Sequence, residues 1–116
     1  MREGDVVLTP LPQANGRLKN RPALLLRALP PFGDFLVCGI STQVRHAVPG
    51  FDEVIRQSDP DFAASGLLAD SVIRLSFLAV LPCGKIVGSI GSIDPTRHER
   101  LLKSLSAHLL ADVTNA

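Results

Sequence analysis

The sequence DPTRHERLLKSLSAHLL at residues 94–110 decides the fold class, because it is the one stretch with a clear helical signature. Asp94 can cap a helix and Pro95 suits the first helical position. An apolar stripe with helical spacing is formed by Leu101, Leu102, Leu105 and Leu109. The solvent side of the helix is predicted to carry Arg97, Arg100 and Lys103, and His98 and His108 are expected at its surface.

The chain before this helix reads as a series of short strands. Apolar, β-branched runs bounded by Pro and Gly turn signals lie at residues 4–9, 22–29, 35–42, 70–81 and 85–90, with a weaker candidate at 51–56. The second and third runs are predicted to form a hairpin, and the run at 85–90 is predicted to pair with 70–81. Residues 10–21 are expected to be an exposed connection. A single helix cannot supply the crossovers of a parallel sheet, so the sequence favours a small, mostly antiparallel barrel.

Composition limits the class of protein. The 116 residues are expected to form one domain, since 46% are hydrophobic and 20% are charged. A net charge of +1 gives no global case for nucleic-acid binding. The isolated Cys38 and Cys83 and a charged N-terminus indicate free thiols in a reducing, cytoplasmic compartment. No apolar run reaches the roughly 20 residues needed to span a bilayer, so no membrane association is expected.

One local segment departs from this even charge distribution. Between residues 17 and 27 the chain contains four basic side chains and no acidic one: Arg17, Lys19, Arg21 and Arg27. Guanidinium groups offer forked donors that match phosphate oxygens, although such a run is also typical of a solvated face. Arg21 precedes Pro22, which favours an extended backbone that places its side chain at the start of a buried strand.

A second candidate region follows the strand at 35–42. Ser41, Thr42 and Gln43 offer three successive hydrogen-bonding side chains, which suits either a pocket at the edge of a barrel or an ordinary strand end. His46 is the only nearby group that titrates near neutral pH. No His, Cys, Asp and Glu residues have metal-ligand spacing, so neither a metal nor a cofactor is expected. Walker A, Rossmann and Gly-x-Ser-x-Gly patterns are also missing.

Taken in order, these pieces resemble the MazF/PemK (Kid-like) toxins of type II toxin-antitoxin modules. The matching segments are REGDVV at residues 2–7, NRPAL at 20–24, ISTQ at 40–43 and LADSVIRL at 68–75, followed by the closing strand and helix. The chain departs from the family pattern in three places. Residues 15–20 contain no acid, a serine replaces threonine at position 41, and residues 76–80 read SFLAV instead of a charged run.

The resemblance implies an SH3-like, PemK/MazF/CcdB-type antiparallel barrel with a C-terminal helix, usually a homodimer. It implies a sequence-specific endoribonuclease that cuts single-stranded mRNA without metal and is inhibited by a cognate antitoxin. Arg21 matches the catalytic arginine, Ser41 matches the catalytic threonine with Thr42 as the adjacent hydroxyl, and Arg74 matches an arginine of Kid-like members. The expected RNA-binding residues are Arg17, Lys19, Gln43, His46 and Arg74.

A different class of function is compatible with the same fold. The related CcdB toxins bind DNA gyrase, so a non-catalytic protein-binding module, or a decayed member that only binds its antitoxin, is the alternative. The pair Arg21 and Ser41 favours the nuclease, because a gyrase binder does not require it. A fixed arginine stabilises the added negative charge of a phosphorane-like transition state more than it stabilises the substrate.

Overall fold

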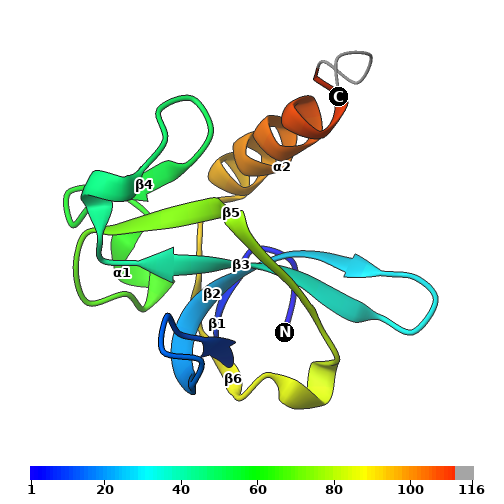
Figure 1. Cartoon of the computed structure of the whole chain (residues 1–116). Helices are drawn as coiled ribbons and strands as arrows, with labels where there is room; N and C mark the ends of the chain where they lie inside the picture. Colours follow the sequence, from blue (N-terminus) through cyan, green and yellow to red (C-terminus); the bar gives the residue numbers. More distant parts are fainter. Residues whose placement is uncertain (112–116) are drawn as a thin grey trace.

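The computed structural model describes residues 1–111 and contains one antiparallel sheet with a long C-terminal helix (Figure 1). The strands are β1 (Asp5–Pro12), β2 (Leu18–Leu29), β3 (Asp34–Ser41), β4 (Glu53–Ile55), β5 (Ser71–Leu81) and β6 (Gly88–Ser92). The helices are the single-turn α1 (Phe62–Ser65) and α2 (Pro95–Leu110). Two 3₁₀ turns, Val44–His46 and Cys83–Lys85, lie in the connections.

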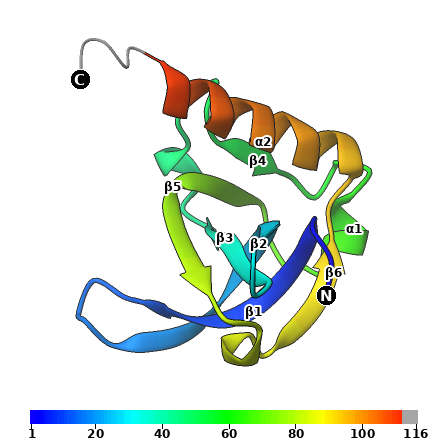
Figure 2. The ribbon, with the colours of Figure 1, turned by 90° about the vertical axis from the view of Figure 1, so that its right-hand side faces the viewer.

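The strands follow the order β4-β5-β3-β2-β1-β6 and curl into a half-barrel that α2 crosses at one end (Figure 2). This arrangement confirms the mostly antiparallel barrel and the hairpin formed by β2 and β3. The prediction that residues 85–90 pair with 70–81 is wrong, because β6 pairs with β1 instead. The turn at Cys83–Lys85 carries the chain away from β5 to the opposite edge of the sheet.

The connection between β1 and β2 is much shorter than the exposed segment predicted for residues 10–21. Pro10 and Pro12 are part of β1, where they lie opposite Asn20 and Leu18. Only residues 13–17 link the two strands, and the Gln13 N–H donates to the Arg17 carbonyl over 2.8 Å. The prediction of a long connection relied on Pro10 and Pro12, but a strand tolerates proline wherever its missing N–H is not needed for pairing. As a result, Arg21 lies inside a strand.

Helix α2 closes the barrel with its first three turns. The Asp94 side chain caps the helix by accepting from the Thr96 N–H over 2.7 Å. Leu101 and Leu105 are buried in a core cluster with residues from the sheet, whereas Leu109 is exposed. The apolar stripe therefore packs as predicted only in its N-terminal half.

Arg97 contradicts its predicted place on the solvent side of α2. It is buried, with ion pairs to Glu53, Asp59 and Asp61 at 2.9–3.1 Å. His98 is also more than a surface residue, since its Nε2 lies 2.8 Å from the Leu26 carbonyl of β2. The expectation for Arg97 is wrong because three carboxylates that are distant in sequence make a buried guanidinium favourable. His108 is exposed, as expected, and contacts the Phe51 ring.

Both cysteines are free, and the helices are short. Cys38 and Cys83 are both free; Cys38 is in the core, where burial raises its pKa to about 12. Within residues 1–111, no helix is long and apolar enough to cross a bilayer.

Helix α1 lies directly against β6, and this contact depends on two glycines. A Cβ atom on Gly91 would overlap the Ala64 carbonyl and the Ser65 backbone, and one on Gly66 would overlap the Ile90 carbonyl. The backbones of the two segments are therefore in direct contact. This contact fixes the segment after α1, which forms a wall of the cavity described below.

Replacing Gly91 by alanine is expected to destabilise the protein by about 1–3 kcal/mol, since the overlap is with backbone atoms that cannot rotate away. Denaturant unfolding followed by circular dichroism would measure the loss. Gly88→Ala is the matched control, because it lies in the same strand and its Cβ would meet no atom within 4 Å. Equal unfolding midpoints for the two variants would contradict the predicted contact.

Candidate functional site

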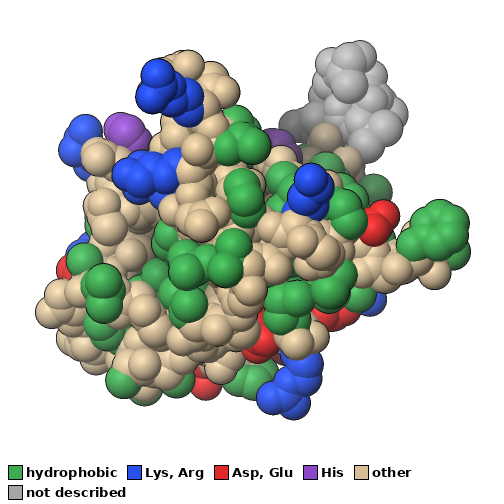
Figure 3. Space-filling view, turned by 90° about the horizontal axis from the view of Figure 1, so that it is seen from below, with side chains coloured by type: hydrophobic (Ala, Val, Ile, Leu, Met, Phe, Trp, Pro, Cys, Tyr) green, Lys and Arg blue, Asp and Glu red, His purple; other side chains and the backbone are tan. Residues whose placement is uncertain are grey.

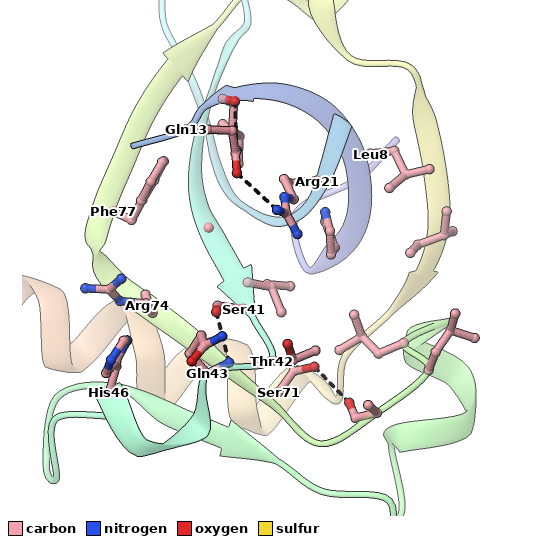
Figure 4. A pocket seen from close by; sticks show the side chains of 18 of the residues that line it. Leu8, Gln13, Arg21, Ser41, Thr42, Gln43, His46, Ser71, Arg74 and Phe77 are labelled. Atoms are coloured by element: carbon pink, nitrogen blue, oxygen red, sulfur yellow. Dashed lines mark hydrogen bonds between the residues drawn. The ribbon is translucent and has the colours of Figure 1, made fainter. Parts of the chain in front are cut away.

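One cavity of about 760 Å³ gathers most of the residues that the sequence marked as functional. It opens on the concave side of the half-barrel, between the β1–β2 turn and the segment after α1, and Figure 4 shows it from close by. Six of the eight predicted site residues line it: Arg21, Ser41, Thr42, Gln43, His46 and Arg74. The other two, Arg17 and Lys19, are exposed and do not line the cavity.

Arg21 reaches the cavity from β2. Its cross-strand partner in β1 is Thr9, and its Nη2 donates to the Gln13 side-chain oxygen over 3.0 Å. The Arg21 side chain makes no other hydrogen bond and no ion pair within residues 1–111. A guanidinium has five N–H groups, so most of its donors are free for a ligand.

The hydroxyl residues come from the end of β3 and the turn after it. The Gln43 N–H donates to Ser41 Oγ over 3.0 Å, which orients the hydroxyl and leaves its proton free to be donated. Ser41 is half-buried, while Thr42 and His46 are exposed at the cavity. The geometry therefore distinguishes the two hydroxyls, since only Ser41 is held by a neighbouring backbone group.

Arg74 is placed by an irregularity in β5. Cys38 pairs with Leu78 while the next residue, Gly39, pairs with Arg74, so β5 bulges between these positions. Phe77, within the bulge, packs over Gly39. Arg74 Nε is buried and has no hydrogen-bond partner within the described chain. A buried donor without an acceptor is uncommon in folded proteins, and here it belongs to a residue lining the cavity.

The charges around the cavity are all of one sign. Its lining includes two arginines and a histidine but no aspartate or glutamate. The ion pairs of the described chain lie elsewhere and use Arg27, Arg56, Arg97, Arg100 and Lys103. Figure 3 likewise shows Lys and Arg side chains gathered near a histidine with no acidic side chain among them. The cavity is therefore suited to an anionic ligand.

Comparison with known proteins agrees with this architecture. A family model described as "PemK-like, MazF-like toxin of type II toxin-antitoxin system" matches residues 2–109. The chain belongs to this toxin family. The solved structure of Mycobacterium tuberculosis toxin MazF-mt6 is similar, with a TM-score of 0.66 and 19% sequence identity over 90% of this chain and 95% of that chain. At that identity the likeness supports the fold alone. No curated protein matches the chain by sequence.

Several residues that line the toxin's cavity were not among the predicted site residues. Gln13, Leu67 and Ser71 line it, and the Ser71 hydroxyl donates to the Ala69 carbonyl over 2.8 Å. Gln13 lies in the stretch interpreted as a loose connection, and Ser71 reads as an ordinary strand residue. The β1–β2 register, the packing of α1 on β6 and the pairing of β5 with β3 and β4 bring them to the cavity.

The toxin's described residues, 1–111, contain no group of three or more His, Cys, Asp and Glu side chains that could hold a metal ion. Asp59 and Asp61 are both bound to Arg97.

Proposed function

We propose that this single domain, residues 1–116, is the toxin of a type II module and a metal-independent, sequence-specific endoribonuclease acting on single-stranded mRNA in the cytoplasm. The observation that carries the proposal is the acid-free cavity lined by both Arg21 and Arg74, the second of which has a buried donor that lacks an acceptor within the described chain. A phosphate supplies acceptors for both guanidinium groups.

The residues suit cleavage by the 2′-hydroxyl of the RNA itself. That oxygen attacks the neighbouring phosphorus and loses its proton, while the 5′-oxygen leaves and gains one, which yields a 2′,3′-cyclic phosphate and a 5′-hydroxyl end. Arg21 stabilises the phosphorane-like state, in which the phosphate carries its greatest negative charge. Ser41 donates a hydrogen bond from its oriented hydroxyl to a phosphate oxygen, with Thr42 beside it.

The remaining predicted residues bind the RNA in this proposal. Arg74, Gln43 and His46 contact the segment held in the cavity, and Arg17 and Lys19 attract the flanking phosphates from the rim. Metal independence is supported by the lining, since a hard cation such as Mg²⁺ requires oxygen ligands and the cavity offers no carboxylate. The same positive charge suits an antitoxin with an acidic tail that covers Arg21 and Ser41.

The direct test is incubation of the purified protein with a long unstructured RNA in excess chelator. Cleavage at a short motif, with cyclic phosphate ends and no cutting of a 2′-O-methyl or DNA copy, is expected. Dependence on added metal, or equal cutting of DNA, would contradict the mechanism. Gyrase inhibition without RNA cleavage would favour the CcdB-like alternative.

We also propose that the toxin is a homodimer joined along β5. Residues 74–81 pair with β3 on one edge, and no described strand pairs with the other edge. Leu78 and Val80 are 41% and 55% exposed there, and residues 75–82 carry no charge. An uncharged, apolar free edge is a site for strand addition by another chain.

Val80→Lys is therefore expected to convert a dimer into a monomer in size-exclusion chromatography with light scattering, because it places a charge on the free edge. Phe32→Lys, at an exposed position in the β2–β3 turn and outside β5, is the control and should leave the mass unchanged. A monomeric wild-type protein, or an unchanged mass for Val80→Lys, would rule out this interface.

A further inference from the structure

Gln13 is the one side chain that hydrogen-bonds to the guanidinium of Arg21 within residues 1–111. It comes from the turn between β1 and β2, in a stretch that gave no functional signal as sequence. Thr9 and Leu11 lie on one face of β1 by alternation, and Arg21 shares that face because it is the cross-strand partner of Thr9. Gln13 follows the last residue of β1.

The turn holds Gln13 firmly. Its N–H donates to the Arg17 carbonyl over 2.8 Å, and its carbonyl accepts from the Gly16 N–H over 2.9 Å. Its side-chain Nε2 donates to the Leu11 carbonyl over 3.1 Å, which leaves Oε1 directed at Arg21. Both ends of the Gln13 amide are therefore engaged, and the direction of its acceptor is fixed.

The chemistry of this contact differs from that of every ion-paired arginine in the described chain. Arg27, Arg56, Arg97 and Arg100 are all held by carboxylates. Gln13 instead offers a neutral oxygen, which restrains the guanidinium without cancelling its charge. A carboxylate in the same place would compete with a phosphate for the same donors.

We propose that Gln13 is a positioning residue for Arg21: a neutral acceptor that orients the guanidinium toward the cavity while leaving its full charge available to a phosphate. This inference rests on the proposed nuclease function for its kinetic consequences, but its effect on anion binding does not require turnover. Preorganised donors are effective because they need not reorient as charge develops.

Two nearly isosteric variants separate orientation from charge. Gln13→Met keeps the size of the side chain but removes the acceptor, and about a 10-fold loss in kcat/KM for RNA cleavage is expected. Gln13→Glu keeps an acceptor but adds a negative charge, and a loss on the order of 10²-fold is expected, approaching that of Arg21→Ala. Thermal melting should show that both variants remain folded.

The same variants are measured for binding to a 2′-O-methyl oligonucleotide, which cannot be cleaved, and each is combined with Arg21→Ala. If Gln13 acts through Arg21, Gln13→Glu weakens binding strongly in the wild-type background and has little further effect once Arg21 is absent. Equal losses in the two backgrounds, or wild-type binding by Gln13→Glu, would overturn the proposal. If the wild-type protein binds this oligonucleotide but cuts no RNA, the proposed function fails and the binding cycle still decides the role of Gln13.

Discussion

Arg21→Ala is expected to reduce RNA cleavage on the order of 10²-fold or more, because it removes a preorganised charge contact to the phosphate. Arg21 projects into a cavity without carboxylates, and its contact within the described chain is to the neutral Gln13. Single-turnover cleavage of a fluorescent RNA, with enzyme in excess, measures the chemical step directly. Arg21→Lys should recover only part of the rate, since an ammonium lacks the planar fork of donors.

The matched control is Arg27→Ala, which lies in the same strand but is paired with Glu3 away from the cavity. It removes the same charge from the protein, and so it tests whether a general loss of positive charge is enough to reduce RNA cleavage. Cleavage by Arg27→Ala should remain within a few-fold of wild type. An equal loss of cleavage in both variants would mean that Arg21 contributes only to the overall electrostatic field of the protein. Undiminished cleavage by Arg21→Ala would show that Arg21 takes no part in the mechanism.

Arg97→Ala is expected to destabilise the fold by about 3–5 kcal/mol, because it leaves a cluster of half-buried carboxylates without its counter-charge. The Arg97 side chain is only 10% exposed and donates to Glu53, Asp59 and Asp61, and also to the Val54 carbonyl. These contacts connect α2 to β4 and to the turn before α1. Equilibrium unfolding in urea would measure the change.

Arg100→Ala provides the comparison, since Arg100 binds the same Glu53 but its side chain is 52% exposed. A surface pair of this kind contributes about 1 kcal/mol or less. The burial of the guanidinium, rather than the number of charges removed, is therefore expected to set the size of the effect. Similar unfolding free energies for the two variants would show that the buried cluster adds nothing to stability.

The Arg97 cluster also predicts a dependence on pH. Burial of Asp61 opposes its ionisation, but the hydrogen bonds from Arg97 and from the Asp94 N–H outweigh burial and lower the pKa of this carboxyl. The stabilisation is therefore complete above the ordinary pKa of an aspartate and is lost as the pH falls below it. The difference in stability between wild type and Arg97→Ala should narrow in acid.

The features that sequence patterns predicted correctly are local. The N-terminal half of α2 follows from the cap at Asp94, Pro95 and the leucine spacing, and the β2–β3 hairpin follows from two apolar runs around a turn. Arg21, Ser41 and Arg74 were marked by the order of short motifs, and the structure brings them to one cavity. Each of these signals is contained within a few consecutive residues, so the sequence displays it directly.

Tertiary structure decided the features that join distant segments. The choice of β1 as the partner of β6, the burial of Arg97 among three carboxylates and the approach of Gln13 to Arg21 all depend on register and packing. The free energy of a buried charge, and the orientation of a side chain by a hydrogen bond, depend on groups that are distant in the sequence. The sequence therefore indicated which residues we propose for the chemistry, whereas the folded sheet decided how those residues are held and which of their donors lack a partner within the described chain.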